Sequence, residues 1–400
     1  MPAYTAEWVL PMTGEPRHRA SISLEDGRIA AIGATVPAGA VHLGRTAVMP
    51  ALVNAHTHLE LSYLRGRVPR TERFLDWIRT VMTTRRQYPD PAHPEIIDAA
   101  RGAIAEAHAS GTGLVGDISN TLVTAPLLSE APVSAQIFYE LLRFNASDAE
   151  SMTREARAKA DAAADPDRDV RVSLAPHAPY SVSPALFAAM RADLDARPGQ
   201  VSSVHLSESP EETEFIRRGS GPWRVLLEEL GVWTDAWAAP GTSPVAYLEQ
   251  IGFLDRRVLA VHGVQFDGDD LGRLRARDMT IVSCPRSNQY VGVGAPPLEA
   301  FYAMNVNVAF GTDSLASAPD LNMFAELAEA RRLAPRVSAR TLLESATRYG
   351  AAALGFEDDY GTLEVGKRAQ VIAVAVPSDV SDVEEYLVSG IEPSDVRWLE

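Results

Sequence analysis

Cysteine and lysine are scarce in this 400-residue sequence, which contains one cysteine, Cys284, and two lysines, Lys159 and Lys367. A single cysteine excludes an intramolecular disulfide and is typical of a reducing compartment, so we expect a cytoplasmic protein. The formal net charge of −16 disfavours a nucleic-acid binder, because phosphate contacts require clustered lysine and arginine. No apolar run approaches the roughly 20 residues that span a bilayer, and the N-terminal stretch lacks the features of a signal peptide.

The composition, with 46% hydrophobic and 22% charged residues, is that of a globular protein with a sizeable core. Short β-branched runs alternate along the chain with longer Ala-rich segments of helical period, such as residues 94–110, 148–164 and 321–334. The eight strand candidates are residues 47–56, 113–118, 133–140, 170–177, 201–208, 258–263, 280–287 and 306–314. This alternation predicts an α/β fold, specifically a (β/α)8 TIM barrel, rather than an open sheet.

Both ends of the chain differ from the middle. Residues 1–46 contain the alternating, turn-rich stretch SISLEDGRIAAIG, and residues 360–376 have the same character. We therefore expect a small β-sandwich domain built from residues 1–46 and 356–400, and a barrel domain over residues 47–355.

A long segment of about 50 residues separates the fifth and sixth predicted strands and carries Trp223, Trp233 and Trp237. Two interpretations are open. The segment either forms a lid on the active face of a barrel, or its tryptophans pack against the outer helices.

Two of the nine histidines lie one residue apart, His56 and His58, at the end of the first predicted strand in the stretch NAHTHLELS. Side chains at positions i and i+2 of a strand share a face, so both imidazoles can point to one cation. Taken alone, the pair fits a metal site or two ordinary histidines equally well.

The other strand ends favour the metal site. His177 ends the fourth predicted strand, His205 the fifth and His262 the sixth, while Asp313 follows the eighth. Active sites of such barrels lie at the carboxyl ends of the strands. Histidine and carboxylate ligands suit zinc or ferrous iron, so we expect one divalent metal, zinc as the first choice and iron as the alternative.

Glu208 lies three residues after His205, where a carboxylate can sit beside the metal without binding it and transfer protons. Glu211, Glu212 and Glu214 are better explained as favourable acids in the first turn of a helix. A second metal would need a carbamylated lysine at a strand end, and neither lysine lies at one. The sequence therefore predicts a mononuclear site.

These motifs resemble those of the amidohydrolase superfamily, in particular its mononuclear deaminase branch. The similarity covers nearly the whole chain and runs in order through PALVNAHTHLELS, APHAPYSVSP, HLSES, VHGVQF, CPRSN, GTDSLAS and GTLEVGKRAQVIAV. One departure is Gln370, where the family usually has an acid. The resemblance implies a hydrolase that uses a metal-activated water to replace a ring amino group with a carbonyl, releasing ammonia.

The family's roles transfer to matching positions. The resemblance implies that the metal ligands are His56, His58, His205 and Asp313. It further implies that Glu208 protonates the ring nitrogen, that His262 orients the attacking water, that Asp313 also takes a proton from water, and that His177 contacts the substrate.

The motifs HTHLELS, GLVGDIS, IFYE, RRGSGPW and SPVAYLEQIG are most similar to those of aminodeoxyfutalosine deaminases, which serve menaquinone biosynthesis. The resemblance implies a nucleoside-like substrate with a benzoate group, for which Arg286, Arg143 and Arg65 are the candidate partners, Arg286 first. Deaminases of S-adenosylhomocysteine, methylthioadenosine and adenosine share the core motifs, and other relatives act on guanine, cytosine or halogenated triazines. These deaminases usually have an acid directly before a tryptophan in the loop after the first strand. Asp76 before Trp77 is a candidate for that acid, and ribose recognition stays open. A barrel that only binds a ligand is disfavoured because every proposed catalytic residue is present. A homodimer is a family-level expectation.

Overall fold

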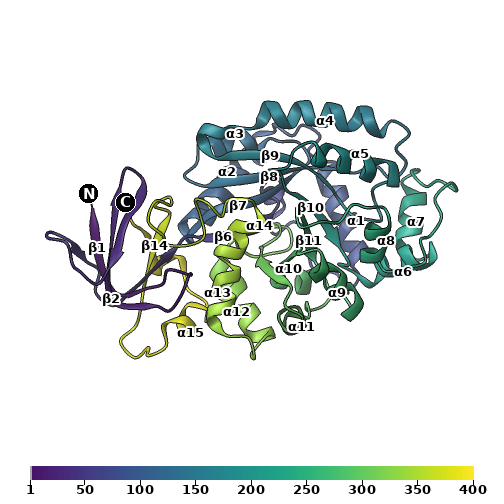
Figure 1. Ribbon diagram of the computed structural model, residues 1–400. Coiled ribbons are helices and arrows are strands. Elements are labelled where there is room, and N and C mark those ends of the chain that lie inside the picture. Colours follow the sequence, from purple (N-terminus) through teal and green to yellow (C-terminus); the bar gives the residue numbers. More distant parts are fainter. Residues whose placement is uncertain (1) are drawn as a thin grey trace.

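Eight parallel strands form the centre of the computed structural model, which describes residues 2–400 (Figure 1). They pair in the orders β6-β7-β8-β9 and β10-β11-β12-β13. Their bounds are β6 Leu52–Thr57, β7 Thr112–Ser119, β8 Ser134–Leu141, β9 Val170–Pro176, β10 Ser202–Leu206, β11 Val258–His262, β12 Thr280–Ser283 and β13 Asn307–Phe310. The predicted α/β class with parallel strands is confirmed.

The two four-stranded sheets contact each other on both sides. Between β9 and β10, the His205 N–H donates to the His177 carbonyl at 2.8 Å. Between β13 and β6, the Asp313 N–H donates to the His56 carbonyl at 3.0 Å, and Thr57 forms a parallel bridge with Asp313. These contacts agree with the closure of the two sheets into one eight-stranded barrel, which stays a prediction. Both seams join residues that the sequence selected as site candidates.

Helices connect and surround these strands. The α-helices between β6 and β14 are α1 Phe74–Arg85, α2 Pro94–Ala109, α3 Thr124–Ser129, α4 Ala149–Ala163, α5 Pro184–Asp195, α6 Pro210–Arg218, α7 Pro222–Glu229, α8 Pro244–Gln250, α9 Gly268–Ala276, α10 Pro285–Tyr290, α11 Leu298–Ala303, α12 Met323–Leu333, α13 Ala339–Ser345 and α14 Arg348–Ala353. The 3-10 helices are η1 Leu59–Leu64, η2 Pro166–Arg168 and η3 Pro393–Asp395, and α15 spans Val383–Leu387. The three helices predicted at 94–110, 148–164 and 321–334 are present as α2, α4 and α12.

The sequence specifies several helix starts by the same dipeptide. In α5, α6 and α8 a serine N-cap precedes a proline, and the serine hydroxyl accepts a hydrogen bond from the third residue of the helix. The proline fixes a helical φ where no N–H is needed, so both residues favour the start of the helix at that point.

The two ends of the chain meet in one seven-stranded sheet, at the left of Figure 1. Its strands are β1 Ala3–Val9, β2 Arg17–Glu25, β3 Arg28–Gly33, β4 Val41–His42, β5 Thr46–Pro50, β14 Val371–Ala375 and β15 Val396–Trp398. The order is β15-β14-β5-β1-β2-β3, with β4 beside β1. The predicted contact between the two ends is therefore present. Within residues 2–400, these seven strands form one hydrogen-bonded sheet. The division of the chain into two domains stays a prediction.

The strand predicted at 47–56 is wrong in one respect. The structure divides it at Ala51, whose N–H donates to the Gln370 carbonyl at 2.9 Å. Residues Thr46–Pro50 belong to the terminal sheet, and residues Leu52–Thr57 begin the parallel strands. The continuous apolar run conceals this change of sheet, because both halves are fully buried.

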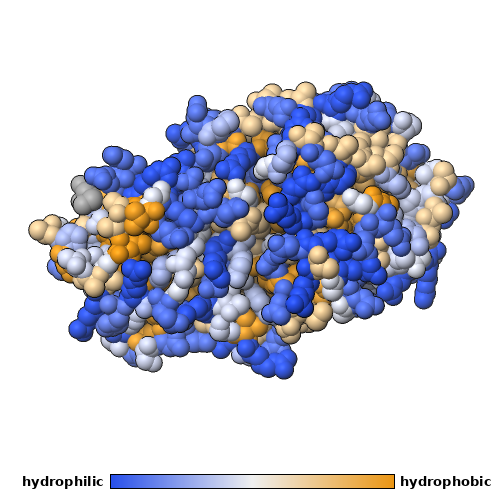
Figure 2. Space-filling model, in the orientation of Figure 1, coloured by the Kyte–Doolittle hydropathy of each residue, from blue (hydrophilic) through white to orange (hydrophobic). Residues whose placement is uncertain are grey.

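Figure 2 shows a mostly hydrophilic surface on the face of Figure 1, with apolar residues gathered over part of the terminal sheet. Within residues 2–400, no helix combines the length and the apolar character that a membrane crossing requires.

Candidate active site

A cavity of about 420 Å³ opens at the carboxyl ends of the parallel strands and is lined by most of the predicted site residues. Its polar end contains His58, His177, His205, Glu208, His262 and Asp313. The volume falls within the range of about 300–1,000 Å³ that is typical of small-molecule sites.

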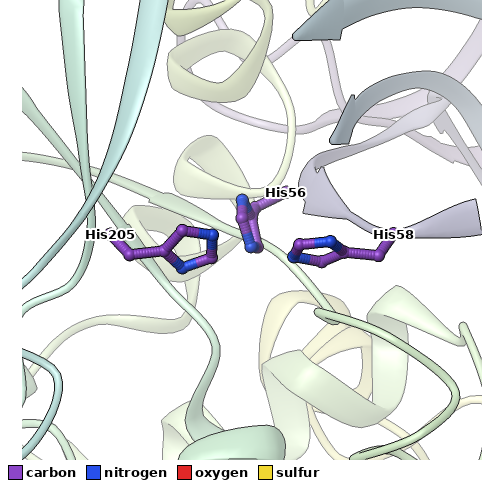
Figure 3. A group of neighbouring side chains, drawn as sticks. All are labelled: His56, His58 and His205. Carbon is purple, nitrogen blue, oxygen red and sulfur yellow. The ribbon is translucent and has the colours of Figure 1, made fainter. Parts of the chain in front are cut away.

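His56, His58 and His205 form a compact cluster at this end (Figure 3). The centroid of the His56 ring lies 5.0 Å from the centroid of the His58 ring and 4.9 Å from that of the His205 ring. Figure 3 shows the His56 ring between the other two, which extend toward it from opposite sides. The strand alternation that places His56 and His58 on one side is thus realised at the end of β6.

Asp313, which follows β13 at the seam with β6, completes the cluster. Its Oδ1 lies 3.4 Å from His58 Nε2 and 3.9 Å from His56 Nε2. The Ser287 hydroxyl donates to Asp313 Oδ2 at 2.6 Å and thereby orients the carboxylate. Gly311 is required two residues earlier, because a Cβ there would lie 2.6 Å from the His56 carbonyl oxygen.

The cluster fits a divalent cation on its own chemistry. Both ring nitrogens of the buried His56 and Nε2 of His205 have no hydrogen-bond partner. Buried polar atoms are rarely left without a partner, so these atoms indicate a ligand. Burial, followed by the neighbouring histidines, holds the pKa of His56 well below its usual value, which keeps its imidazole neutral as metal binding requires.

Glu208 lies beside this cluster, with Oε1 3.7 Å from His262 Nε2. Burial raises the pKa of the Glu208 carboxyl to about 8, so that it retains a proton at neutral pH and is able to donate it. Burial lowers the pKa of His262 to about 3. The neutral His262 ring contacts His205 Nδ1 at 2.9 Å and the Asn288 amide at 3.0 Å.

Glu212 has a role that the sequence analysis did not find. We expected a solvated acid in the first turn of α6, but the side chain is completely buried. Its carboxylate accepts hydrogen bonds from the backbone N–H groups of Ser207 and Glu208, both at 2.9 Å. The Ser-Pro-Glu-Glu stretch at 209–212 is a capping pattern that carries this signal.

Glu140 and Asn120 were also missed, although both line the cavity. Glu140 Oε1 lies 3.3 Å from His205 Nε2, and Asn120 Nδ2 donates to Glu140 Oε2 at 2.8 Å. Burial opposes ionisation of Glu140, but His177 and His205 lower its pKa overall, so it is an anion. His177, in turn, has its Nδ1 2.6 Å from the Ser181 hydroxyl. The strand-end position of Glu140 in IFYE was the available signal.

Glu60, the acid of the NAHTHLELS stretch, lies behind the cavity wall. Its buried carboxylate accepts hydrogen bonds from the N–H of Asn120 at 3.0 Å, the N–H of Thr121 at 3.1 Å and the hydroxyl of Ser119 at 2.8 Å. Arg85 Nη2 lies 3.5 Å from the same carboxylate. Glu60 therefore supports the loop after β7 and does not itself line the cavity.

The walls of the cavity are apolar and come from two helices. α1 and its neighbour α7 contribute the side chains Phe74, Trp77, Ile78, Val81, Met82, Trp223, Leu226 and Leu227. Trp223 stacks on Tyr180 with ring centroids 3.7 Å apart. Trp233 and Trp237 instead pack around Phe144 and Phe215. Trp223 therefore lines the cavity, whereas Trp233 and Trp237 pack away from it, and a lid function of the segment stays a prediction.

Arg286 does not line this cavity. Its guanidinium donates to Asp320 at 2.9 Å and lies 3.5 Å from the buried Glu326 carboxylate. Arg65 pairs with Glu106 on the surface, and the exposed Arg143 is likewise not among the lining residues. The geometry thus gives no support to these three arginines as substrate partners.

Two consecutive arginines that the sequence analysis did not select do line the cavity, Arg85 and Arg86. Arg85 contacts Asn120 Oδ1 at 3.2 Å. The exposed Arg86 side chain has no ion pair or side-chain hydrogen bond among residues 2–400. Asp76, considered as a ribose partner, is exposed and lies 3.5 Å from Arg79. The cationic part of the cavity is therefore at the end of α1.

The two lysines lie away from the cluster, as expected. Lys159 is exposed on α4, and Lys367 pairs with Glu364 at 3.3 Å. Neither lines the cavity, so no lysine of the described chain is placed to bridge two metals.

Comparison with known proteins supports the family that the sequence motifs resemble. The model of the amidohydrolase family matches residues 47–391. The aminodeoxyfutalosine deaminase of Deinococcus radiodurans is 33% identical over 321 residues, which cover 77% of this chain and 73% of that protein. The 5-methylthioadenosine/S-adenosylhomocysteine deaminase of Moorella thermoacetica is 28% identical over 97% of this chain and 90% of that protein.

A solved structure is similar over nearly the full length. The adenosine deaminase of Xanthomonas campestris, crystallised with bound zinc, has a TM-score of 0.80 at 27% identity and covers 98% of this chain and 90% of that one. The chain belongs to the amidohydrolase family and is a hydrolase that acts on carbon–nitrogen bonds.

Proposed function

We propose that this chain is a metal-dependent aminohydrolase that removes the amino group of an adenine nucleoside-type substrate, 6-aminodeoxyfutalosine first, as a step of menaquinone biosynthesis. The reaction consumes one water, replaces the amino group with a carbonyl oxygen and releases ammonia. The observation that carries the proposal is the position of the Glu208 carboxyl group beside the histidine cluster, at the polar end of an otherwise apolar cavity. We place this site at the mouth of a closed (β/α)8 barrel.

The residues that would hold the metal are His56, His58, His205 and Asp313. When bound, a divalent metal would lower the pKa of a water molecule and so supply a nucleophile near neutral pH. We propose zinc, because imidazole and carboxylate ligands suit it and the Xanthomonas relative contains it.

The chain's own residues then handle the protons. Glu208 gives its proton to the ring nitrogen adjacent to the reacting carbon, so that negative charge does not accumulate there. Asp313 takes a proton from the attacking water and passes it to the departing amino group, which leaves as ammonia, and the new hydroxyl group returns a proton to Glu208 as it becomes the carbonyl. The neutral His262 would orient the attacking water. His177, held by Ser181, would contact the substrate from the opposite wall.

The chemistry of the cavity supports a nucleoside with an extended apolar or aromatic group and an acid. The aromatic and aliphatic side chains of α1 and α7 suit a ring or an alkyl thioether. The Arg86 guanidinium, without an internal partner, suits a carboxylate. We therefore transfer the role proposed for Arg286 to Arg86.

The second candidate is deamination of methylthioadenosine or S-adenosylhomocysteine. The Moorella relative, which matches more of this chain than the Deinococcus protein does, favours it. The apolar walls accommodate a thioether equally well. Arg86 separates 6-aminodeoxyfutalosine from methylthioadenosine, which has no carboxylate. S-adenosylhomocysteine also carries a carboxylate, so for that substrate the comparison of kcat/KM values decides.

The test is an ammonia-release assay of the zinc-loaded protein with 6-aminodeoxyfutalosine, S-adenosylhomocysteine, methylthioadenosine, adenosine, guanine and cytosine. We expect the highest kcat/KM with 6-aminodeoxyfutalosine, and about one metal per chain by elemental analysis. Highest activity with methylthioadenosine would select the second candidate. Activity only on a free base would overturn the nucleoside proposal, and a stoichiometric second metal would overturn the mononuclear site.

A further inference from the structure

We infer that Glu212 is a positioning residue. Its carboxylate accepts hydrogen bonds from the backbone N–H groups of Ser207 and Glu208 and thereby fixes the direction of the Glu208 side chain. This inference rests on the proposed function, because it assigns Glu208 the proton transfer. It concerns a side chain that touches neither the histidine cluster nor the cavity.

The turn between β10 and α6 consists of residues 207–209. β10 ends at Leu206, one residue after His205, and Glu208 lies in the turn that follows, so this turn sets the direction of the Glu208 side chain relative to the cluster. Ser207 has a φ of 52°, a left-handed conformation that a residue with a side chain rarely adopts. Such a conformation persists only where surrounding contacts hold it.

Glu212 supplies those contacts. Its Oε1 accepts the Ser207 N–H at 2.9 Å and its Oε2 accepts the Glu208 N–H at 2.9 Å. Two parallel N–H donors to one carboxylate fix both the distance and the plane of the turn. On the other side, the Gln265 N–H donates to the Ser207 carbonyl at 2.8 Å. The left-handed residue is thus clamped at its N–H and at its carbonyl.

Helix capping alone does not account for this arrangement. A capping-box glutamate bonds back to the N–H of the N-cap residue. Here the N-cap is Ser209, whose hydroxyl accepts the Glu212 N–H at 3.3 Å. The Glu212 carboxylate reaches past Ser209 to the N–H of Ser207 and to the N–H of Glu208, the proposed catalytic acid. The contact therefore stabilises the turn rather than only the first turn of α6.

The experiment compares Glu212→Gln and Glu212→Ala with Glu211→Gln in the zinc-loaded protein. Glutamine retains one acceptor and turns its amide N–H₂ toward the second donor, while alanine removes both acceptors. Glu211 is the matched control, because it is the adjacent acid of the same helical turn and accepts no hydrogen bond from residues 207 or 208. Each variant is checked for metal content and for cooperative unfolding.

A misplacement of about 1 Å of a catalytic group costs on the order of 10²-fold in rate. We expect Glu212→Gln to lower kcat by roughly 10- to 100-fold with KM changed by less than about threefold, and Glu212→Ala to lower kcat further. Glu211→Gln should remain at the wild-type value. Amide hydrogen exchange at Ser207 and Glu208 should become faster in both Glu212 variants.

The outcomes separate the two proposals. A wild-type protein that releases no ammonia from any substrate overturns the proposed function, and the exchange rates at Ser207 and Glu208 still test whether Glu212 holds the turn. An active wild-type protein with a Glu212→Gln variant of unchanged kcat overturns the positioning role. A loss of kcat that merely follows a loss of bound metal or folded protein also overturns it, because Glu212 would then be a structural residue only.

Discussion

The carboxylate of Glu60 holds the backbone N–H of Asn120 at 3.0 Å, although the two residues lie 60 positions apart in the chain. The Asn120 side chain in turn joins Arg85 to Glu140, both of which line the cavity. The acid of the first-strand motif is thus connected to the substrate wall through one hydrogen-bonded loop.

Replacing Glu60 with glutamine should disturb this wall without removing a metal ligand. Several buried donors would lose an acceptor, so we expect the free energy of unfolding to fall by about 1–3 kcal/mol. KM should rise more than kcat falls, because Asn120 and Arg85 would lose their support. Steady-state kinetics and urea denaturation measure both effects, with Glu72→Gln, an exposed acid, as the control. A variant with unchanged KM and reduced metal content would contradict this role.

Glu208→Gln should abolish ammonia release while the metal stays bound. The amide cannot give up a proton to the ring nitrogen, and general acid–base catalysis contributes roughly 10²–10⁴-fold in rate. We expect a kcat loss in that range with about one metal per chain. Near wild-type turnover by this variant would remove Glu208 from the proton transfer.

Arg86→Ala should raise KM for a carboxylated nucleoside and leave adenosine unaffected. A hydrogen bond to a charged group contributes about 1.5–3 kcal/mol, which corresponds to roughly 10- to 100-fold in KM. Arg79→Ala is the matched control, because Arg79 lies on the same helix and pairs with Asp76 and Glu229 outside the cavity. Equal changes for both substrates would exclude carboxylate recognition by Arg86.

Arg286→Ala should instead act on stability. The variant removes the hydrogen bond from the guanidinium to Asp320 and the cationic neighbour of the fully buried Glu326, so we expect the free energy of unfolding to fall by about 1–3 kcal/mol. Thermal or urea unfolding measures this loss. A folded variant of normal stability whose KM rises only for a carboxylated substrate would restore Arg286 to the substrate site.

Acid should destabilise the metal-free protein. Burial lowers the pKa of His262 to about 3, whereas an unfolded histidine titrates near about 6.5. Between these values the unfolded chain binds a proton that the folded chain does not, so the free energy of unfolding decreases as pH falls. The loss is about 1.4 kcal/mol per pH unit for this histidine, and none is expected from it above pH ~6.5. Urea denaturation at several pH values, with His262→Asn for comparison, tests the slope, and an identical slope in both proteins would contradict it.

The sequence predicted those parts of the site that depend on strand ends. His56, His58, His205, His262 and Asp313 follow parallel strands, and the carboxyl ends of such strands meet at one face. The direction of a side chain beyond a strand end is set by tertiary contacts that spacing does not encode. Arg286 lies in a strand-end motif yet turns to Asp320 and Glu326, whereas Arg85 and Arg86 reach the cavity from the end of a helix.

Buried acids were the other gap. Glu212 has the sequence environment of a solvated helix-start residue, and its burial follows only from how α6 packs after β10. Glu140 was visible as a strand-end carboxylate, but strands without a histidine gave no reason to select it. The break at Ala51 was hidden for a similar reason, because two buried strands of different sheets read as one apolar run.

That break ties the site to the last part of the chain. β5 ends at Pro50 and β6, which carries His56, begins at Leu52, so a single residue separates the terminal sheet from the first ligand strand. β5 has β14, residues Val371–Ala375, as its antiparallel neighbour. β5 is synthesised more than 300 residues before β14, so the two strands can pair only after residues 371–375 have left the ribosome. The first ligand strand therefore gains the full support of β5 only when residues 371–375 have paired with it, although these residues lie far from His56 in the chain.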